Sequence, residues 1–279
     1  MRKLDVREIS DAVARLATEA AYRLGASERE AIDAARSREE SEHGRAALGE
    51  ILENAELAAG GERPLCQDTG LAVVFVELGL DVHLTGGSLR DAVDEGVRHA
   101  YAEAYLRKSV CDPFSRANTG DNAPAVLHVC TAPGDGVHIR FAAKGGGSEN
   151  CSRLAMLTPA DGREGVKRFA VETIERAGAK SCPPLVVGVG VGGNFETCAI
   201  LAKRALLREF GRPSPDADLA ALEREIWEEA NATGVGPSGL GGRVTVLAVH
   251  VEVAPCHIAS LPVAVNLDCH AHRHGEAVL

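Results

Sequence analysis

Apolar side chains recur along the first 60 residues at intervals of two to four, as they do on one face of an amphipathic helix. The first helix is expected to begin near Leu4, and Gly25 is placed to end it. Ser27, with Glu30 three residues later, forms the capping-box pattern that starts a second helix. A third helix is predicted over residues 46–59. The pattern therefore predicts a helical N-terminal region over residues 1–60.

From residue 61 onward, β-branched apolar runs alternate irregularly with helical patterns. The predicted strands lie at 71–80, 125–130, 137–143, 185–191, 244–253 and 261–265, and the predicted helices at 88–105, 162–177, 194–210 and 219–233. The segment TAPGDG between the second and third strands favours a β-hairpin. Because the regular alternation of a doubly wound sheet is missing, we expect an α+β fold with small, mostly antiparallel or mixed sheets flanked by helices.

Composition and charge exclude several classes of function. No shift in composition marks a boundary, so residues 1–279 are expected to form a single domain with two regions, 1–60 and 61–279. The net charge of −10 argues against a nucleic-acid-binding surface, which needs a basic stripe. No apolar run approaches the roughly 18 residues that span a bilayer. The N-terminal segment turns acidic before any apolar run, unlike a signal peptide, so we expect a protein of the reducing cytoplasm.

The eight cysteines are the most informative feature of the composition. None belongs to a C-x-x-C pair, so the patterns of zinc ribbons, thioredoxins and ferredoxins are absent. Cys66, Cys182 and Cys269 each lie in a predicted turn with Pro, Gly or polar neighbours. Cys130 and Cys198 instead fall within strand and helix patterns, where a buried thiol is ordinary packing. Any metal shared by the turn cysteines would have ligands that are dispersed along the chain.

Two other patterns suggest ligands less strongly. Gly188, Gly190 and Gly193 spell G-x-G-x-x-G between a strand and a helix, but the expected acidic strand about 20 residues further on is missing. We interpret these glycines as a turn where the backbone approaches a bulky neighbour. Five of the ten histidines lie between residues 250 and 274 and, with Cys269, could form a zinc site. They lack the paired spacing of a structural zinc site.

Six uncommon motifs occur in an order that resembles a known family. They are CQDTG at 66–70, NTGDNAPA at 118–125, KGGGSEN at 144–150, SCPP at 181–184, GVGVGGNFE at 188–196 and CHIASLPVAVNLDCHAHRH at 256–274. Together they resemble the class I, iron–sulfur-dependent fumarate hydratases and, more closely, the separate α subunit of two-subunit fumarases and L(+)-tartrate dehydratases. The resemblance implies a [4Fe-4S] cluster held by Cys66, Cys182 and Cys269. One iron would stay open to act as a Lewis acid.

The resemblance also implies roles for residues around the cluster. Gln67 and Asp68 are expected to contact a small dicarboxylate substrate, with Asp68 in proton transfer. Arg107 is expected to clamp a substrate carboxylate, which suits its bidentate guanidinium. The backbone N–H of Gly147 and the side chain of His257 are expected to contact the substrate as well.

The expected reaction is the reversible hydration of fumarate to L-malate. L(+)-tartrate or a mesaconate-type acid is the alternative substrate, and a non-catalytic iron–sulfur or zinc-binding protein is the alternative of another class. The family also uses a second module that supplies arginine, lysine and threonine groups, and this chain ends ten residues after Cys269. A β subunit is therefore expected as a partner, in an α2β2 assembly, and the α chain alone should be nearly inactive.

Overall fold

The chain forms two compact units, each built from segments that are far apart in the sequence. The structure, a computed structural model, describes residues 1–61 and 63–279. The first unit comprises residues 1–25, 55–146 and 273–279, and the second comprises 26–54 and 147–272. Each contains one four-stranded mixed sheet with helices, which confirms the α+β class. No helix in the described part of the chain has the length and apolar character of a membrane span.

The sheet of the first unit has the strand order β10-β5-β2-β4. The elements of this unit are β1 (Arg2–Asp5), α1 (Val6–Tyr22), β2 (Leu71–Gly79), β3 (Val82–Thr85), α4 (Leu89–Glu103), β4 (Val126–Ala132), β5 (Val137–Lys144) and β10 (His274–Val278). Helices α1 and α4 pack together because α4 carries Gly96, where a Cβ would lie 2.5 Å from the carbonyl oxygen of Ser10. The strands β1 and β3 form a separate parallel pair.

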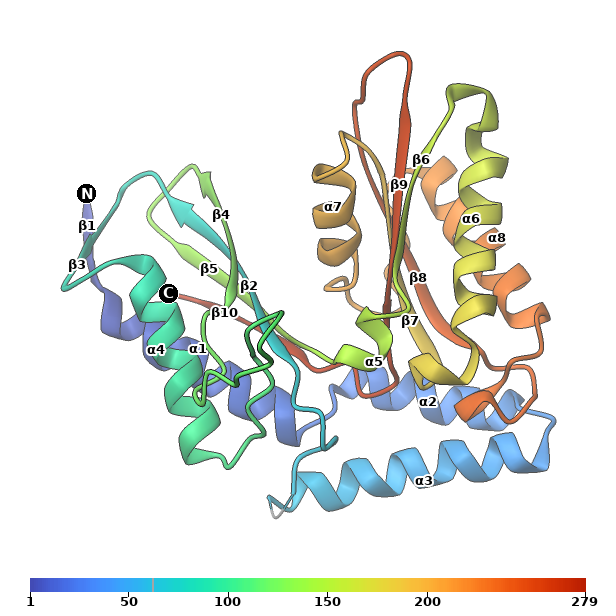
Figure 1. Ribbon diagram of the computed structural model, residues 1–279, viewed down its shortest axis with the longest axis horizontal. Helices are drawn as coiled ribbons and strands as arrows, with labels where there is room; N and C mark the ends of the chain where they lie inside the picture. Colours follow the sequence, from blue (N-terminus) through green and yellow to red (C-terminus); the bar gives the residue numbers. More distant parts are fainter. Residues whose placement is uncertain (62) are drawn as a thin grey trace. The chain divides into compact units, whose positions relative to one another are not determined.

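The sheet of the second unit has the strand order β6-β9-β7-β8. Its elements are α2 (Ala26–Arg38), most of α3 (Glu42–Ala59), β6 (Arg153–Leu157), α6 (Gly162–Ala177), β7 (Leu185–Gly192), α7 (Thr197–Ala205), α8 (Ala217–Ala232), β8 (Val246–Ala254) and β9 (Leu261–Asp268). The short helix α5 (Gly146–Glu149) lies at the boundary between the units. Figure 1 shows α7 on one side of the sheet and α6 and α8 on the other.

The glycines of the G-x-G-x-x-G pattern let a helix approach a strand. Gly188 and Gly190 lie within β7, and their missing side chains face α7. A Cβ at Gly188 would lie 2.1 Å from the carbonyl oxygen of Ala202, and one at Gly190 would lie 2.0 Å from that of Cys198. The bulky neighbour is therefore the backbone of α7, so these two glycines serve packing within the second unit.

Both sheets repeat one arrangement of strand directions. In the first unit, β2 pairs in parallel with β4 and antiparallel with β5. In the second, β7 pairs in parallel with β8 and antiparallel with β9. The predicted hairpin of residues 125–143 is therefore wrong, because β2 lies between β4 and β5. The TAPGDG connection instead passes the end of β2, where Leu80 N–H donates to the carbonyl of Ala132 at 2.9 Å.

Candidate functional site

In the first unit, the turn of residues 66–70 is fixed immediately before β2. The hydroxyl of Thr69 donates to the carbonyl of Arg107 at 2.7 Å. The hydroxyl of Tyr101, on α4, donates to the carbonyls of Thr69 and Gly70 at 2.7 and 3.0 Å, and the side-chain amide of Asn122 donates to Gly70 at 3.1 Å. Burial raises the pKa of Tyr101 to about 12, so its hydroxyl stays a donor. These contacts bring three sequence-distant segments onto one turn.

The carboxylate of Asp68 is oriented by the backbone. Its Oδ1 accepts the N–H of Gly70 at 3.1 Å, and its Oδ2 accepts the N–H of Gly146 at 2.7 Å. A Cβ at Gly145 would lie 3.4 Å from Oδ2 and 3.2 Å from Nη2 of Arg273, so the glycine leaves room for both groups. The side chain is only partly buried. Asp68 is therefore a fixed carboxylate that remains open to a ligand.

Arg273 is a site residue that the sequence reasoning missed. It is 3% exposed, and its Nη1 donates to the backbone carbonyl of Asp68. Its own carbonyl accepts the N–H of Ala143 at 2.9 Å, at the junction of β5 and β10. Among residues 1–61 and 63–279, no hydrogen-bond partner is found for its buried Nε atom. A buried guanidinium thus holds the backbone of the turn at Asp68. In the sequence, the position of Arg273 within the motif HAHRH was the only feature that could have indicated this role.

The remaining predicted residues of the first unit lie on or beside the same turn. Cys66 is partly exposed, and Gln67 and Arg107 are exposed. Because the carbonyl of Arg107 accepts the hydroxyl of Thr69, the segment of Arg107 lies against the turn. The structure therefore places Cys66, Gln67, Asp68 and Arg107 in one neighbourhood of the first unit.

In the second unit, the turns of Cys182 and Cys269 lie side by side. The backbone N–H of His270 donates to the carbonyl of Cys182 at 3.4 Å, and the Nδ1 of its ring lies 3.1 Å from the same oxygen. Cys182 has a left-handed backbone conformation, with φ of 54°, and is exposed. Cys269 follows directly after β9 and is partly exposed. All eight cysteines lie in the described ranges, and none forms a disulfide.

A buried polar network lies behind Cys269. Nδ1 of His272 lies 2.8 Å from Oδ2 of Asp268, and the hydroxyl of Ser148 donates to Oδ1 of Asp268 at 3.3 Å. All three residues are buried. The ring of Phe210 stacks on His272 with centroids 5.7 Å apart. Since Ser148 follows Gly147, this network joins the glycine loop to the turn of Cys269 within the second unit.

His257 lies elsewhere in the second unit. It is exposed on the connection between β8 and β9, beside a cavity lined also by the ends of β7 and β8. Cys269 follows the other end of β9, and an eight-residue strand is roughly 26 Å long at about 3.3 Å per residue. Figure 1 shows the β8–β9 connection at one end of the sheet and the end of β9 at the other. The second unit therefore does not bring His257 to its own Cys182 and Cys269.

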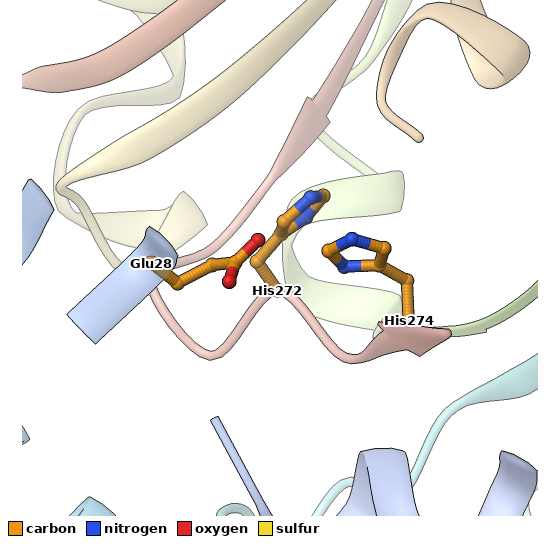
Figure 2. A group of neighbouring side chains, drawn as sticks. All are labelled: Glu28, His272 and His274. Carbon is orange, nitrogen blue, oxygen red and sulfur yellow. The ribbon is translucent and has the colours of Figure 1, made fainter. Parts of the chain in front are cut away.

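Figure 2 shows Glu28, His272 and His274. Glu28 and His272 are buried in the second unit, whereas His274 opens β10 in the first. The hydroxyl of Ser27 donates to Glu28 at 3.0 Å, and His272 is held by Asp268. Glu28 and His272 thus each have a hydrogen-bond partner within the second unit, and we assign no metal to this group.

Comparison with known proteins agrees with the motifs. Residues 10–278 match the family described as fumarate hydratase (Fumerase). A protein of Methanocaldococcus jannaschii, named provisionally as L(+)-tartrate dehydratase subunit alpha, is 41% identical over 272 residues, which cover 95% of each chain. The L(+)-tartrate dehydratase subunit alpha of Escherichia coli K12 is 35% identical over 245 residues, covering 86% of this chain and 80% of the relative. The chain belongs to the fumarate hydratase (Fumerase) family of hydro-lyases.

Proposed function

We propose that the chain is the α subunit of a two-subunit hydro-lyase that adds water to, or removes it from, a four-carbon dicarboxylic acid. The observation that carries the proposal is the turn of residues 66–70. It presents Asp68 in a fixed orientation between the N–H groups of Gly70 and Gly146, with the buried cation of Arg273 behind it. The relatives named as subunit alpha support a second, β subunit, which we expect in an α2β2 assembly.

Three candidate substrates can be compared. The family name supports fumarate, hydrated reversibly to L-malate, and the names of the two relatives favour L(+)-tartrate, which loses water to give oxaloacetate. L-malate and L(+)-tartrate both carry two carboxylates, and L(+)-tartrate has an additional hydroxyl on the carbon that loses the proton. A mesaconate-type acid, with a methyl group, is the third candidate. We place L(+)-tartrate first on the strength of the relatives and fumarate second.

We propose further that Cys66, Cys182 and Cys269 hold a [4Fe-4S] cluster. Thiolates are the usual ligands of such clusters, and three of them leave one iron without a protein ligand. The adjacent turns of Cys182 and Cys269 suit this role within the second unit. When bound, the cluster supplies a Lewis acid for the hydroxyl that leaves. Such thiol ligation is consistent with a reducing cytoplasm.

The residues of the chain would handle the substrate and its protons. The carboxylate of Asp68 is held at both oxygens by backbone N–H groups, so it can exchange a proton with substrate without changing its orientation. The exposed guanidinium of Arg107 can bind a carboxylate through two parallel hydrogen bonds. Gln67 and the N–H of Gly147 would add further donors, and His257 would contribute its imidazole.

The experiment that tests the function compares the purified αβ complex with its Asp68→Asn variant. The complex, prepared without oxygen, should contain iron and sulfide and should convert L(+)-tartrate, fumarate or both. Asp68→Asn keeps the size of the side chain but removes its proton exchange, so turnover should fall roughly 100-fold or more, whereas iron content should not change. Zinc without sulfide, or full activity in Asp68→Asn, would reject the proposal in favour of a structural metal site.

The substrate can be identified by measuring the activity of the αβ complex on a panel of dicarboxylic acids. The kcat/KM values for L(+)-tartrate, L-malate, fumarate and mesaconate should differ, with the highest value for L(+)-tartrate. A site that hydrogen-bonds an additional hydroxyl discriminates strongly against an acid that lacks it. A higher kcat/KM for fumarate than for L(+)-tartrate would reverse the order of the two candidates.

A further inference from the structure

The glycine loop, residues 145–147, leads into the short helix α5 and carries the N–H that we expect the substrate to contact. Gly147 is exposed, and a Cβ there would lie 3.5 Å from the carbonyl oxygen of Lys180, two residues before Cys182. Three consecutive glycines have wide conformational freedom, and α5 has only four residues, so neither can fix the direction of this N–H alone. The orientation of the loop therefore depends on side chains outside it.

Glu149, the last residue of α5, ties the loop to the sheet of the second unit. Its Oε2 accepts the side-chain amide of Asn266, a buried residue of β9, at 3.0 Å. The same amide donates to the hydroxyl of Ser152 at 3.2 Å, and this hydroxyl donates to the carbonyl of Ser148 at 3.2 Å. The carboxylate two residues after Gly147 is thus bound to a buried group of an inner strand.

Lys203 completes this attachment from α7. Its ammonium group donates to the two carboxylate oxygens of Glu149 at 2.5 and 2.6 Å, and its side chain is only 15% exposed. An ion pair that is partly shielded from water and engages both oxygens holds its members more firmly than an exposed pair does. Lys203 follows Ala202, whose carbonyl oxygen comes close to β7 because Gly188 has no side chain. The glycines of β7 therefore help to place the helix that carries Lys203.

We propose that Lys203 is a positioning residue: through Glu149, it holds the N–H of Gly147 in the direction of the substrate. The inference rests on the proposed function, in which this N–H binds the substrate. A donor that is held in its binding orientation in advance loses less conformational freedom when the substrate binds. Loss of Lys203 should therefore weaken substrate binding and leave the chemical step nearly unchanged.

The kinetic test uses the αβ complex with Lys203→Met, which keeps a long side chain and removes its charge. The KM for the preferred acid should rise roughly 10-fold, with a change of less than about twofold in kcat, and the iron content should not change. Lys203→Arg can still engage both oxygens of Glu149 and should restore most of the wild-type KM. Unchanged kinetics in Lys203→Met, or a joint loss of kcat and iron at the wild-type KM, would overturn the inference.

Lys167 provides the matched control. Its ammonium group, on α6, pairs with Glu164 and Glu229 at 3.0 and 2.8 Å, and its side chain is 16% exposed. Figure 1 shows α6 on the opposite side of the sheet from α7. Lys167→Met therefore removes a similar ion pair of the same unit without touching the glycine loop, and its KM should stay at the wild-type value. An equal rise of the KM in Lys167→Met and Lys203→Met would contradict positioning through the loop.

Glu149→Gln separates positioning from a direct effect of charge on the substrate. This variant and Lys203→Met both break the ion pair, but they change the charge beside the loop in opposite directions. A loosened loop should raise the KM in both variants. Direct electrostatic attraction of the dianionic acid would instead raise the KM in Lys203→Met and lower it in Glu149→Gln, and that pattern would reject a positioning role.

Hydrogen exchange reports on the loop without any turnover. In the αβ complex without substrate, the backbone amides of residues 145–152 should exchange faster in Lys203→Met than in the wild type, and at the wild-type rate in Lys167→Met. Equal exchange in Lys203→Met and the wild type would overturn the inference. If the wild-type complex converts no acid, the proposed function fails, and the exchange rates alone decide whether Lys203 holds the loop.

Discussion

Glu39 is a buried carboxylate whose charge is balanced by backbone N–H groups. It is 3% exposed and accepts the N–H groups of Ser41, Arg243 and Val244 at 2.9, 2.9 and 2.8 Å. Burial alone would raise the pKa of Glu39, but these hydrogen bonds outweigh it and hold the pKa below its usual value. Glu39 thereby fastens the loop of residues 241–244 to the link between α2 and α3, within the second unit.

Glu39→Gln should lower the free energy of unfolding by about 1–3 kcal/mol at pH 7, because an amide cannot accept all of these N–H groups as well as a carboxylate does. A carboxyl group with a lowered folded pKa stabilises above its unfolded pKa and loses this effect as the pH falls through the folded pKa. The difference between wild type and variant should therefore shrink toward pH 3. Urea unfolding at several pH values measures this, and Glu40→Gln, at a 67% exposed side chain, is the control.

Arg273 lends itself to a prediction about activity. Its guanidinium binds the carbonyl of Asp68, so Arg273→Gln should let the turn of residues 66–70 shift and should lower kcat roughly 10- to 100-fold. Iron content should stay near the wild-type value, since Arg273 ligates nothing. Arg98→Gln, which breaks an exposed pair with Asp121 in the same unit, should leave kcat unchanged. Equal losses in both variants would show that Arg273 only stabilises the fold.

The sequence identifies site residues only where a motif carries them. Cys66, Gln67 and Asp68 share one short motif, so their neighbourhood follows from chain connectivity alone. Arg273 and Asp68 are 205 positions apart, and Tyr101 is 32 positions from Thr69. Such contacts depend on how β2, β5 and β10 pair. No local pattern reports that pairing, which is why Arg273, Tyr101 and Asn122 were missed.

At the scale of elements, the long periodic segments were predictable and the short ones were not. The helix at 162–177 and the strands at 71–80 and 185–191 are confirmed within a residue or so as α6, β2 and β7. The first helix begins at Val6 instead of Leu4, because Arg2–Asp5 pair with β3. The short strands β1, β3, β6 and β10 mix polar and apolar residues without a clear period. These short strands are stabilised by the strands with which they pair, so their own sequences do not predict them.

Gly190 supports a prediction at this scale. A Cβ there would lie 2.0 Å from the carbonyl oxygen of Cys198 on α7. The oxygen belongs to the backbone of α7, and the Cβ would be attached to the backbone of β7. Neither atom could therefore move away without separating the helix from the strand. Gly190→Ala should therefore lower the free energy of unfolding by more than about 3 kcal/mol. Gly49→Ala in α3, where a Cβ meets nothing closer than 3.6 Å, should be neutral or stabilising by up to about 1 kcal/mol. Urea unfolding of the two variants compares them directly.

At the scale of the whole molecule, the two sheets share the same order of strand directions, and this shared order explains where the predicted site residues lie in each unit. Cys66 precedes β2 and Cys182 precedes β7, and these two strands hold equivalent places in their sheets. The glycine loop follows β5 and Cys269 follows β9, which again hold equivalent places. The three predicted cluster cysteines and the glycine loop therefore each lie at one end of the sheet of their unit, whereas His257 lies at the opposite end of the second sheet.

The last prediction concerns what the chain can do without its β subunit. The dicarboxylate carries two negative charges. The exposed Arg107 is the cation of the first unit that we expect to bind one carboxylate, whereas the guanidinium of Arg273 is buried and already bound to a backbone carbonyl. Arg107 can hold one carboxylate through two parallel hydrogen bonds, and we expect a cationic side chain of the partner to help to hold the second. The α chain, reconstituted without oxygen, should contain iron and sulfide but turn over fumarate and L(+)-tartrate negligibly until the β subunit is added. Substantial turnover by the α chain alone would show that its own residues complete the site.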